Sequence, residues 1–172
     1  AVMTLDEAVR TRRSVRRYTG KPLTDGQVRH LMEAAMATPS ACDCRPWEFV
    51  VVRDREQLAR IAACGKYSGM AAQAGAVIVI CALPGRQEIC PGFFPQDCGA
   101  VAMSIWLTAT AMGLGAVWCG VYPDEGMVGR VAQVVGTPQD VVPFGLICVG
   151  EPAEHPEPRD RYEPSRVHAD RW

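Results

Sequence analysis

The sequence has none of the short motifs that commonly mark a nucleotide-binding or hydrolytic enzyme. It contains no G-x-G-x-x-G before a helix, no G-x-x-x-x-G-K-[ST] phosphate loop and no G-x-S-x-G elbow. Its eight cysteines include no C-x-x-C pair, and none of its three histidines, His30, His155 and His168, has a metal-binding partner at ligand spacing. Because no catalytic dyad is evident, demanding chemistry would have to come from a bound cofactor.

Strong net charge is absent as well. The 18 Lys and Arg residues nearly balance the 19 Asp and Glu residues, which gives a formal net charge of -1. No general attraction to nucleic acid or to a membrane surface is therefore expected, and any anion site must be local. With 172 residues, of which 48% are apolar and 22% charged, the chain suits one globular domain with its own core.

No charged residue occurs between Cys98 and Pro123, and a run of this length could span a membrane. Gly113 and Gly115 interrupt it, however, and Ala, Thr, Ser and Gly dominate over leucine. That composition favours a buried helix at the centre of a soluble domain or a dimer interface. We therefore expect no association with a membrane.

The cysteines are scattered, and Cys81 and Cys148 lie inside runs rich in valine and isoleucine. This pattern favours free thiols in a reducing cytoplasm over a disulfide framework. We expect a cytoplasmic protein, since no apolar leader segment opens the sequence. Cys42 and Cys44, separated by one residue, are the exception and could act as a thiol redox or metal-binding pair.

Caps and hydrophobic periodicity predict a mixed order of helices and strands. Capping boxes at Thr4-x-x-Glu7 and Thr24-x-x-Gln27 open the first two helices. The sequence predicts helices at about 4–12, 24–37, 54–64, 96–114 and 124–135, strands at about 47–53, 76–83, 116–122 and 142–150, and a loop at 85–95. Such an order indicates a sheet packed with helices.

The last residues differ in character from the rest of the chain. Residues 151–172 are polar and rich in proline, so they cannot fold alone. In a solvated tail the side chains of Tyr162, Val167 and Trp172 would bury no apolar surface. We therefore expect residues 1–150 to form the domain and residues 151–172 to form an arm laid across a neighbouring surface.

Residues 10–18, RTRRSVRRY, hold five arginines within eight residues. Because like charges repel, such a cluster needs an anion, a carboxylate or open solvent. It suits a solvated helix end, a nucleic-acid arm, or a phosphate clamp that uses forked guanidinium groups and the Ser14 hydroxyl. Arg10 and Arg17 are assigned to the helix end. Residues 39–47, PSACDCRPW, form a turn before an apolar strand, and the two segments together indicate a pocket.

Several of these features occur together in an order typical of one family. They are Arg12-Arg13-Ser14-x-Arg16 with Tyr18 and Pro22, Pro39-Ser40-Ala41 with Pro46-Trp47, Gln96-Asp97, GLGAVWCG at 113–120, and Arg159-x-Arg161-Tyr162 with Arg166, Val167, His168 and Trp172. Over almost its whole length the chain resembles the short members of the FMN-dependent nitroreductase family. The resemblance implies an α+β sandwich of helices on a mixed, mainly antiparallel sheet. It also implies an intertwined homodimer in which residues 151–172 cross to the partner subunit.

The resemblance further implies one FMN in each of two interface pockets. Arg12 and Arg13 are expected to hold its phosphate, and Ser14 to contact the ribityl chain or the phosphate. Arg161 and Arg159, on the arm, are expected to complete the phosphate clamp.

A second group of residues is expected around the flavin ring. Arg16 is expected at the N1–C2=O edge, where its charge stabilises the negative charge of the reduced ring. Trp118, Cys119 and Gly120 are expected beneath the ring, with the Gly120 N–H near N5, so that Arg16 and Gly120 are the catalytic residues. The partner subunit is expected to contribute Pro39, Ser40 and Ala41, and Asp43 is expected to face the ring as well.

The chain departs from the family pattern at Asp43, where members commonly have asparagine, and at Arg45, where they commonly have glutamine. A carboxylate only accepts hydrogen bonds, and its charge opposes formation of the reduced anionic ring. Arg45 or Arg16 could neutralise that charge, so the two departures bear on the redox potential and not on the fold.

The resemblance implies an oxidoreductase that passes two electrons from NADH or NADPH through flavin N5 to a small aromatic or quinone-like acceptor. Donor and acceptor would stack in the same place in turn, which gives ping-pong kinetics. Two alternatives stay open. One is a flavin-binding or sensing module without turnover, and the other is a thiol redox or metal-binding protein that uses Cys42 and Cys44.

Overall fold

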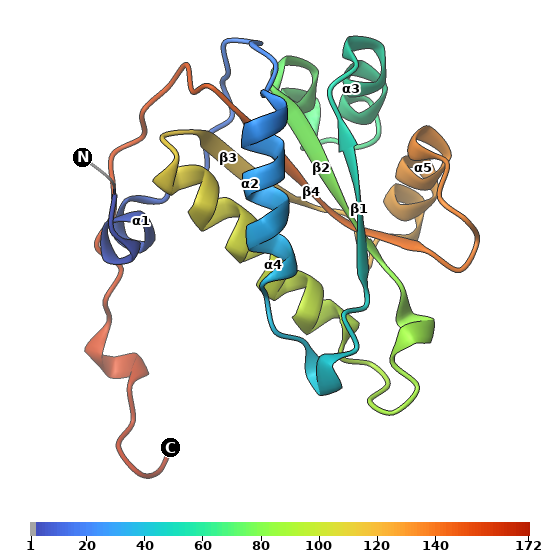
Figure 1. Cartoon of the computed structure of the whole chain (residues 1–172). Helices are drawn as coiled ribbons and strands as arrows, with labels where there is room; N and C mark the ends of the chain where they lie inside the picture. Colours follow the sequence, from blue (N-terminus) through green and yellow to red (C-terminus); the bar gives the residue numbers. More distant parts are fainter. Residues whose placement is uncertain (1–2) are drawn as a thin grey trace.

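A computed structural model describes residues 3–172 and shows one antiparallel sheet covered by helices (Figure 1). The strands are β1 (Trp47–Val52), β2 (Ala76–Ala82), β3 (Gly115–Gly120) and β4 (Val142–Gly150), in the spatial order β1-β2-β4-β3. All three strand pairings are antiparallel. The predicted α+β class is confirmed. The sheet itself is antiparallel, and the only parallel pairing among residues 3–172 is an isolated bridge between Ser14 and Ala116.

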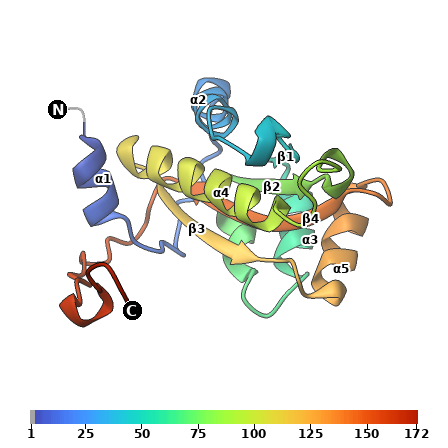
Figure 2. The same cartoon turned by 90° about the horizontal axis from the view of Figure 1, so that it is seen from below.

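The helices form a layer on each face of the sheet. They are α1 (Leu5–Thr11), α2 (Asp25–Met36), α3 (Arg55–Ala62), α4 (Phe94–Ala111) and α5 (Glu125–Val135), with short 3-10 turns η1 (Ala41–Asp43), η2 (Gly69–Gln73), η3 (Pro84–Arg86) and η4 (Pro164–Arg166). Figure 2 shows α2 and α4 on one face and α3 and α5 on the other. Central strand β2 is buried at every position, because its Ile78 packs with α2 and α4 and its Val77 with α3 and α5.

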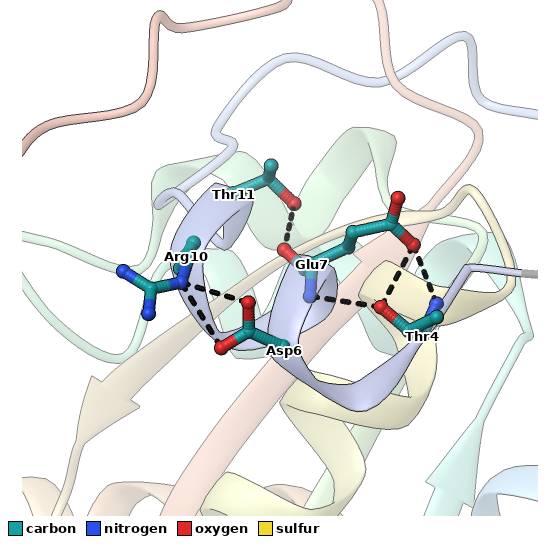
Figure 3. Close-up of polar contacts among 5 residues, drawn as sticks. All are labelled: Thr4, Asp6, Glu7, Arg10 and Thr11. Carbon is teal, nitrogen blue, oxygen red and sulfur yellow. Dashed lines mark hydrogen bonds and ion pairs between the residues drawn. The ribbon is translucent and has the colours of Figure 1, made fainter.

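Both predicted capping boxes are present. In α1 the Glu7 N–H donates to Thr4 Oγ1 at 3.2 Å, and the Thr4 N–H donates to Glu7 Oε2 at 2.7 Å (Figure 3). In α2 the equivalent bonds between Thr24 and Gln27 measure 3.2 and 2.9 Å. Two otherwise unpaired N–H groups at each helix start are thereby satisfied.

The long helix α4 departs from the predicted boundaries at both ends. It begins at Phe94, not at residue 96, because Pro95 occupies its first turn, where a missing N–H costs no hydrogen bond. It ends at Ala111, since Gly113 adopts a left-handed φ of 75°. The preceding segment, predicted as loop, contains the short turn η3.

The arginine-rich segment, residues 12–19, lies between the outer edge of β3 and the start of the C-terminal arm. The Val15 N–H donates to the Ala116 carbonyl at 3.0 Å, and the Ala153 N–H donates to the Arg17 carbonyl at 2.8 Å. Gly115 permits this approach, because a Cβ there would lie 2.6 Å from Val15 Cγ1. The buried Tyr18 hydroxyl donates to the carbonyls of Val15, at 2.5 Å, and Cys148, at 3.1 Å. The segment is therefore fixed on both sides.

Candidate functional site

A cavity of about 800 Å³ lies along the outer edge of β3, and we call it the strand-edge cavity. Four segments meet there: residue 16, the connection after α3, strand β3 and the start of α5. Its lining comprises Arg16, Gly65, Lys66, Tyr67, Ser68, Gly69, Met70, Val117, Trp118, Cys119, Gly120, Asp124, Met127 and Arg130. The structure thus brings Arg16 together with Trp118, Cys119 and Gly120, which the sequence placed around one ring.

Strand β3 offers the cavity an open backbone at Gly120, whereas the Trp118 indole packs toward α4, against Gly99 and Phe144. A Cβ added at Gly120 would meet nothing within 4 Å, so a planar group can approach this backbone closely. Trp118 Nε1 is buried without a hydrogen-bond partner in the described chain, and a Cβ at Gly145 would lie 2.7 Å from it. Gly145 therefore leaves the space that the indole occupies.

Cys119 lies in the wall of the strand-edge cavity, where its thiol is buried near Tyr67 and Met70. A hydrogen bond with the Cys148 thiol lowers the pKa of Cys119, and the positive charge of Arg16 acts in the same direction, while burial opposes both. The Cys119 thiol also lies 3.5 Å from the Tyr67 carbonyl.

Sequence reasoning missed the connection at residues 65–70, which forms one wall of this cavity. Buried Ser68 fixes it: its Oγ donates to the carbonyls of Ala62 and Gly65 and accepts from the Gly65 N–H, all at 3.0 Å. Lys66 places its ammonium 5.3 Å from the Tyr67 ring centroid. The available signal was that Lys66, one of only two lysines, directly follows Gly65, where the sequence predicted the end of a helix that in the structure already ends at Ala62.

A second cavity, of about 550 Å³, lies where the two ends of the chain meet, and we call it the arginine cavity. It is lined by Val9, Arg10, Arg12, Arg13, Pro158, Arg159, Asp160, Arg161 and Tyr162. The Arg12 guanidinium lies 4.3 Å from the centroid of the Trp106 ring on α4. Burial lowers the pKa of Arg12, and the neighbouring charges of Arg161 and Arg13 lower it further. Such a site gains from a bound anion.

Arg10 lies in the last turn of α1, at the helix end as expected, and its side chain binds a carboxylate there. Its Nε donates to both carboxylate oxygens of Asp6, at 3.0 and 2.9 Å, one turn earlier on α1 (Figure 3). The remaining four arginines of the cavity form no ion pair with a side chain of residues 3–172; these are Arg12, Arg13, Arg159 and Arg161. The cluster thus keeps its positive charge for a ligand.

The other predicted site residues lie elsewhere in the chain. Ser14 pairs with β3 and lines neither cavity. Four residues of the turn before β1 also line neither: Pro39, Ser40, Ala41 and Asp43. The turn is held by α4, because the Ala41 N–H donates to buried Asp97 at 3.1 Å. Asp43 pairs with Arg45 at 3.3 Å, and both have a left-handed φ, of 51° and 46°.

Comparison with known proteins settles the family. Residues 9–64 and 62–151 match the family model described as the Nitroreductase family. The chain belongs to the nitroreductase family. A family relative from Methanothermobacter thermautotrophicus, named as an NADH dehydrogenase/NAD(P)H nitroreductase, is 42% identical over 166 residues, covering 96% of this chain and 86% of its own.

Two further nitroreductase-family comparisons extend this finding. The crystal structure of a Parabacteroides distasonis protein, also named as an NADH dehydrogenase/NAD(P)H nitroreductase, superimposes with a TM-score of 0.92 at 32% identity, covering 98% of both chains. A Bacillus subtilis protein named FMN reductase [NAD(P)H] is 27% identical, over 91% of this chain and 69% of its own. The predicted family and fold are thereby confirmed.

Two features are absent from the part of the chain that the structure describes: a membrane-spanning helix and a cluster of metal ligands. No helix among residues 3–172 has the length and apolar character needed to cross a membrane. Over the same residues, no group of three or more His, Cys, Asp or Glu side chains is placed to hold a metal ion. The thiols of Cys42 and Cys44 therefore have no third ligand in the described part of the chain.

Proposed function

We propose that this protein uses FMN to carry two electrons from NADH or NADPH to a small aromatic or quinone-like acceptor, with donor and acceptor bound in turn. The chain is an NAD(P)H-dependent oxidoreductase of the nitroreductase family, and its cofactor is FMN. The observation that carries the finer proposal is the placement of one segment. It contributes Arg12 and Arg13 to the arginine cavity and Arg16 to the strand-edge cavity.

The donor set of the arginine cavity fits a phosphate monoester. Its guanidinium groups are planar forks that bind phosphate oxygens in pairs, and one of them, Arg12, is partly desolvated against Trp106. Arg159 and Arg161 bring further charge from the arm. We assign these residues to the phosphate and Ser14, next in sequence to Arg13, to the adjoining sugar chain.

The strand-edge cavity fits a flat ring system. The open backbone at Gly120 accepts close approach of a planar group, and strand β3 from Val117 to Gly120 lines the adjoining wall. When bound, FMN supplies hydride acceptance at N5 and delivery of two electrons to the acceptor. Arg16 holds a fixed positive charge where negative charge accumulates, and the Gly120 N–H is a donor toward N5. We assign the catalytic role to these two residues.

The remaining residues are assigned to a second copy of the chain. Pro39, Ser40, Ala41 and Asp43 line neither cavity of their own chain, which is the arrangement expected if they complete the flavin pocket of a partner. The arm has a matching feature, because Tyr162, Val167 and Trp172 are all exposed in the single chain. We therefore propose a homodimer with residues 1–150 as the flavin-binding domain and residues 151–172 as the exchanged arm.

Absorption spectroscopy of the purified protein tests the function. We expect the visible bands of oxidised flavin, bleached by NADH or NADPH without oxygen and restored by a quinone or a nitroaromatic compound. A double-reciprocal plot with parallel lines would support ping-pong turnover. Flavin bands that resist both nicotinamides would favour a sensing module, and a protein that binds no flavin would leave the thiol pair as the functional site.

Asp43 and Arg45 are expected to set the flavin potential as a compensating pair. Removing one charge of the pair changes the electrostatic energy of the reduced ring by about 1 kcal/mol, or roughly 20 mV for a two-electron couple. Asp43→Asn should raise the midpoint, Arg45→Gln should lower it, and the double variant should return close to wild type. Spectroelectrochemical titration measures all three, and an unchanged midpoint in both single variants would place the pair away from the flavin.

A further inference from the structure

A pair of thiols joins two segments that are far apart in the sequence. Cys44 Sγ lies 3.5 Å from Cys90 Sγ, although 46 positions separate the two residues. Cys44 is half-buried at the end of the turn before β1, and Cys90 is buried in the segment before α4. Cys42, in contrast, is exposed; its carbonyl oxygen lies 3.9 Å from the Cys44 thiol, and its own side chain neighbours the Cys90 thiol. Proximity therefore pairs Cys44 with Cys90 and not with its neighbour in sequence.

One buried carboxylate holds both segments in place. Asp97 Oδ1 accepts the Ala41 N–H at 3.1 Å, and Asp97 Oδ2 accepts from Gln87 Nε2 at 2.5 Å. The Cys90 thiol also donates to the Ala41 carbonyl at 3.5 Å. Asp97 is fixed in the first turn of α4, so it holds the two segments together. The two thiols therefore stay close in the folded protein and need no diffusive encounter to react.

The two thiols differ in reactivity. Cys44 is partly open to solvent and can be reached by a small oxidant. Burial raises the pKa of Cys90, and the neighbouring thiols of Cys44 and Cys42 raise it further. Cys44 is therefore the sulfur that reacts first, and Cys90 is the sulfur that resolves the product.

We propose that Cys44 and Cys90 are a modification site, a dithiol that a peroxide converts reversibly into a disulfide. A disulfide needs an S–S distance of about 2.05 Å, so the sulfurs must approach by roughly 1.5 Å from their present separation. Neither residue lies in a strand or an α-helix, so closure requires no change in the sheet.

The chemistry balances in two steps. The Cys44 thiolate attacks one oxygen of the peroxide, whose O–O bond breaks, and forms a sulfenic acid while hydroxide leaves and takes up a proton as water. The Cys90 sulfur then attacks the Cys44 sulfur; the S–O bond breaks, and the departing hydroxide takes the Cys90 proton as a second water. Two thiols and one hydrogen peroxide thus give one disulfide and two waters. A small dithiol reverses the bond by two thiol–disulfide exchanges and is itself oxidised to a disulfide.

The bond would link the turn at residues 40–45 directly to the segment that leads into α4. That turn contains three non-glycine residues in the left-handed region, Cys42, Asp43 and Arg45, so its backbone is already held in an unusual conformation. The proposed site does not depend on flavin, and it is tested by covalent chemistry and not by turnover.

Treatment of the purified 172-residue protein with hydrogen peroxide, followed by alkylation in denaturant, tests the proposal. The reactive thiols should fall from eight to six and return to eight after reduction with a small dithiol. Cleavage after basic residues and before aspartates separates residues 43–53 from residues 87–96, each with a single cysteine, Cys44 or Cys90. These two peptides should be found joined.

Serine variants provide the matched controls. Cys44→Ser and Cys90→Ser should keep all seven remaining thiols after mild oxidation, whereas Cys42→Ser should still lose two. Eight unreacted thiols in the wild type, or a bond from Cys42 to Cys44 or to Cys90, would overturn the proposal. If a serine variant fails to fold, the peptide map of the wild type still shows whether Cys44 and Cys90 are joined.

Discussion

Replacing Arg12 with alanine should release FMN from the purified protein. A charge-assisted hydrogen bond to a partly buried phosphate is worth roughly 1.5–3 kcal/mol, which corresponds to about a ten- to hundred-fold rise in the dissociation constant. The loss should be at the upper end, because Arg12 also packs over Trp106 and its position is therefore well defined. Quenching of free flavin fluorescence on titration with protein measures the constant directly.

Arg17→Ala is the matched control for this experiment. Arg17 lies in the same segment, but its side chain is exposed and lines neither cavity. Its backbone carbonyl accepts a hydrogen bond from Ala153, which the substitution leaves intact. Equal losses in the two variants would mean that the arginines act as a diffuse positive field and not as a clamp.

Removing residues 155–172 should weaken both flavin binding and dimerisation. The truncation deletes Arg159 and Arg161 from the arginine cavity and three exposed apolar side chains from the arm. It spares Glu151 and Glu154, which bond to the backbone N–H groups of Thr19 and Arg16, so the arginine-rich segment keeps its anchor. We expect a loss of FMN affinity at least as large as in Arg12→Ala, and a shift toward monomer in sedimentation at micromolar concentration.

The double variant Arg159→Ala/Arg161→Ala separates the two effects of the arm. It removes the charges but keeps Tyr162, Val167 and Trp172, so it should lose FMN affinity and remain a dimer. If the truncated protein keeps wild-type FMN affinity, the arm has no part in the clamp. If it stays dimeric, the arm does not hold the subunits together.

Local rules predicted most of the fold, because its signals lie within a few residues of each other. Both capping boxes form as their spacing requires, and Gly136 ends α5 in the left-handed conformation. The start of α4 was missed because Pro95 was interpreted as a loop residue. Proline is also favoured in the first turn of a helix, where its missing N–H would have no partner. Boundaries of this kind depend on which of two allowed conformations the neighbours select.

The candidate site was only partly predictable, for a different reason. Family motifs located Arg16 and Gly120 in advance, and the structure places them in one cavity. The wall at residues 65–70 carries no motif, and it reaches the site only because Ser68 folds the connection back on itself. Likewise, the partner of Cys44 could not be inferred from spacing, since its contact with Cys90 depends on the shared carboxylate of Asp97.

On the proposed assignment of the FMN phosphate, the meeting of the two chain ends at the arginine cavity links ligand binding to folding. Arg12 and Arg161 are 149 positions apart, and they come together only after the segment at residues 12–19 has docked on β3 and the arm has docked on that segment. An unfolded chain therefore offers no comparable anion site, and a ligand held there adds its binding free energy to the native state alone. At 100 times its dissociation constant, such a ligand contributes about 2.7 kcal/mol, a large share of the stability of an ordinary domain.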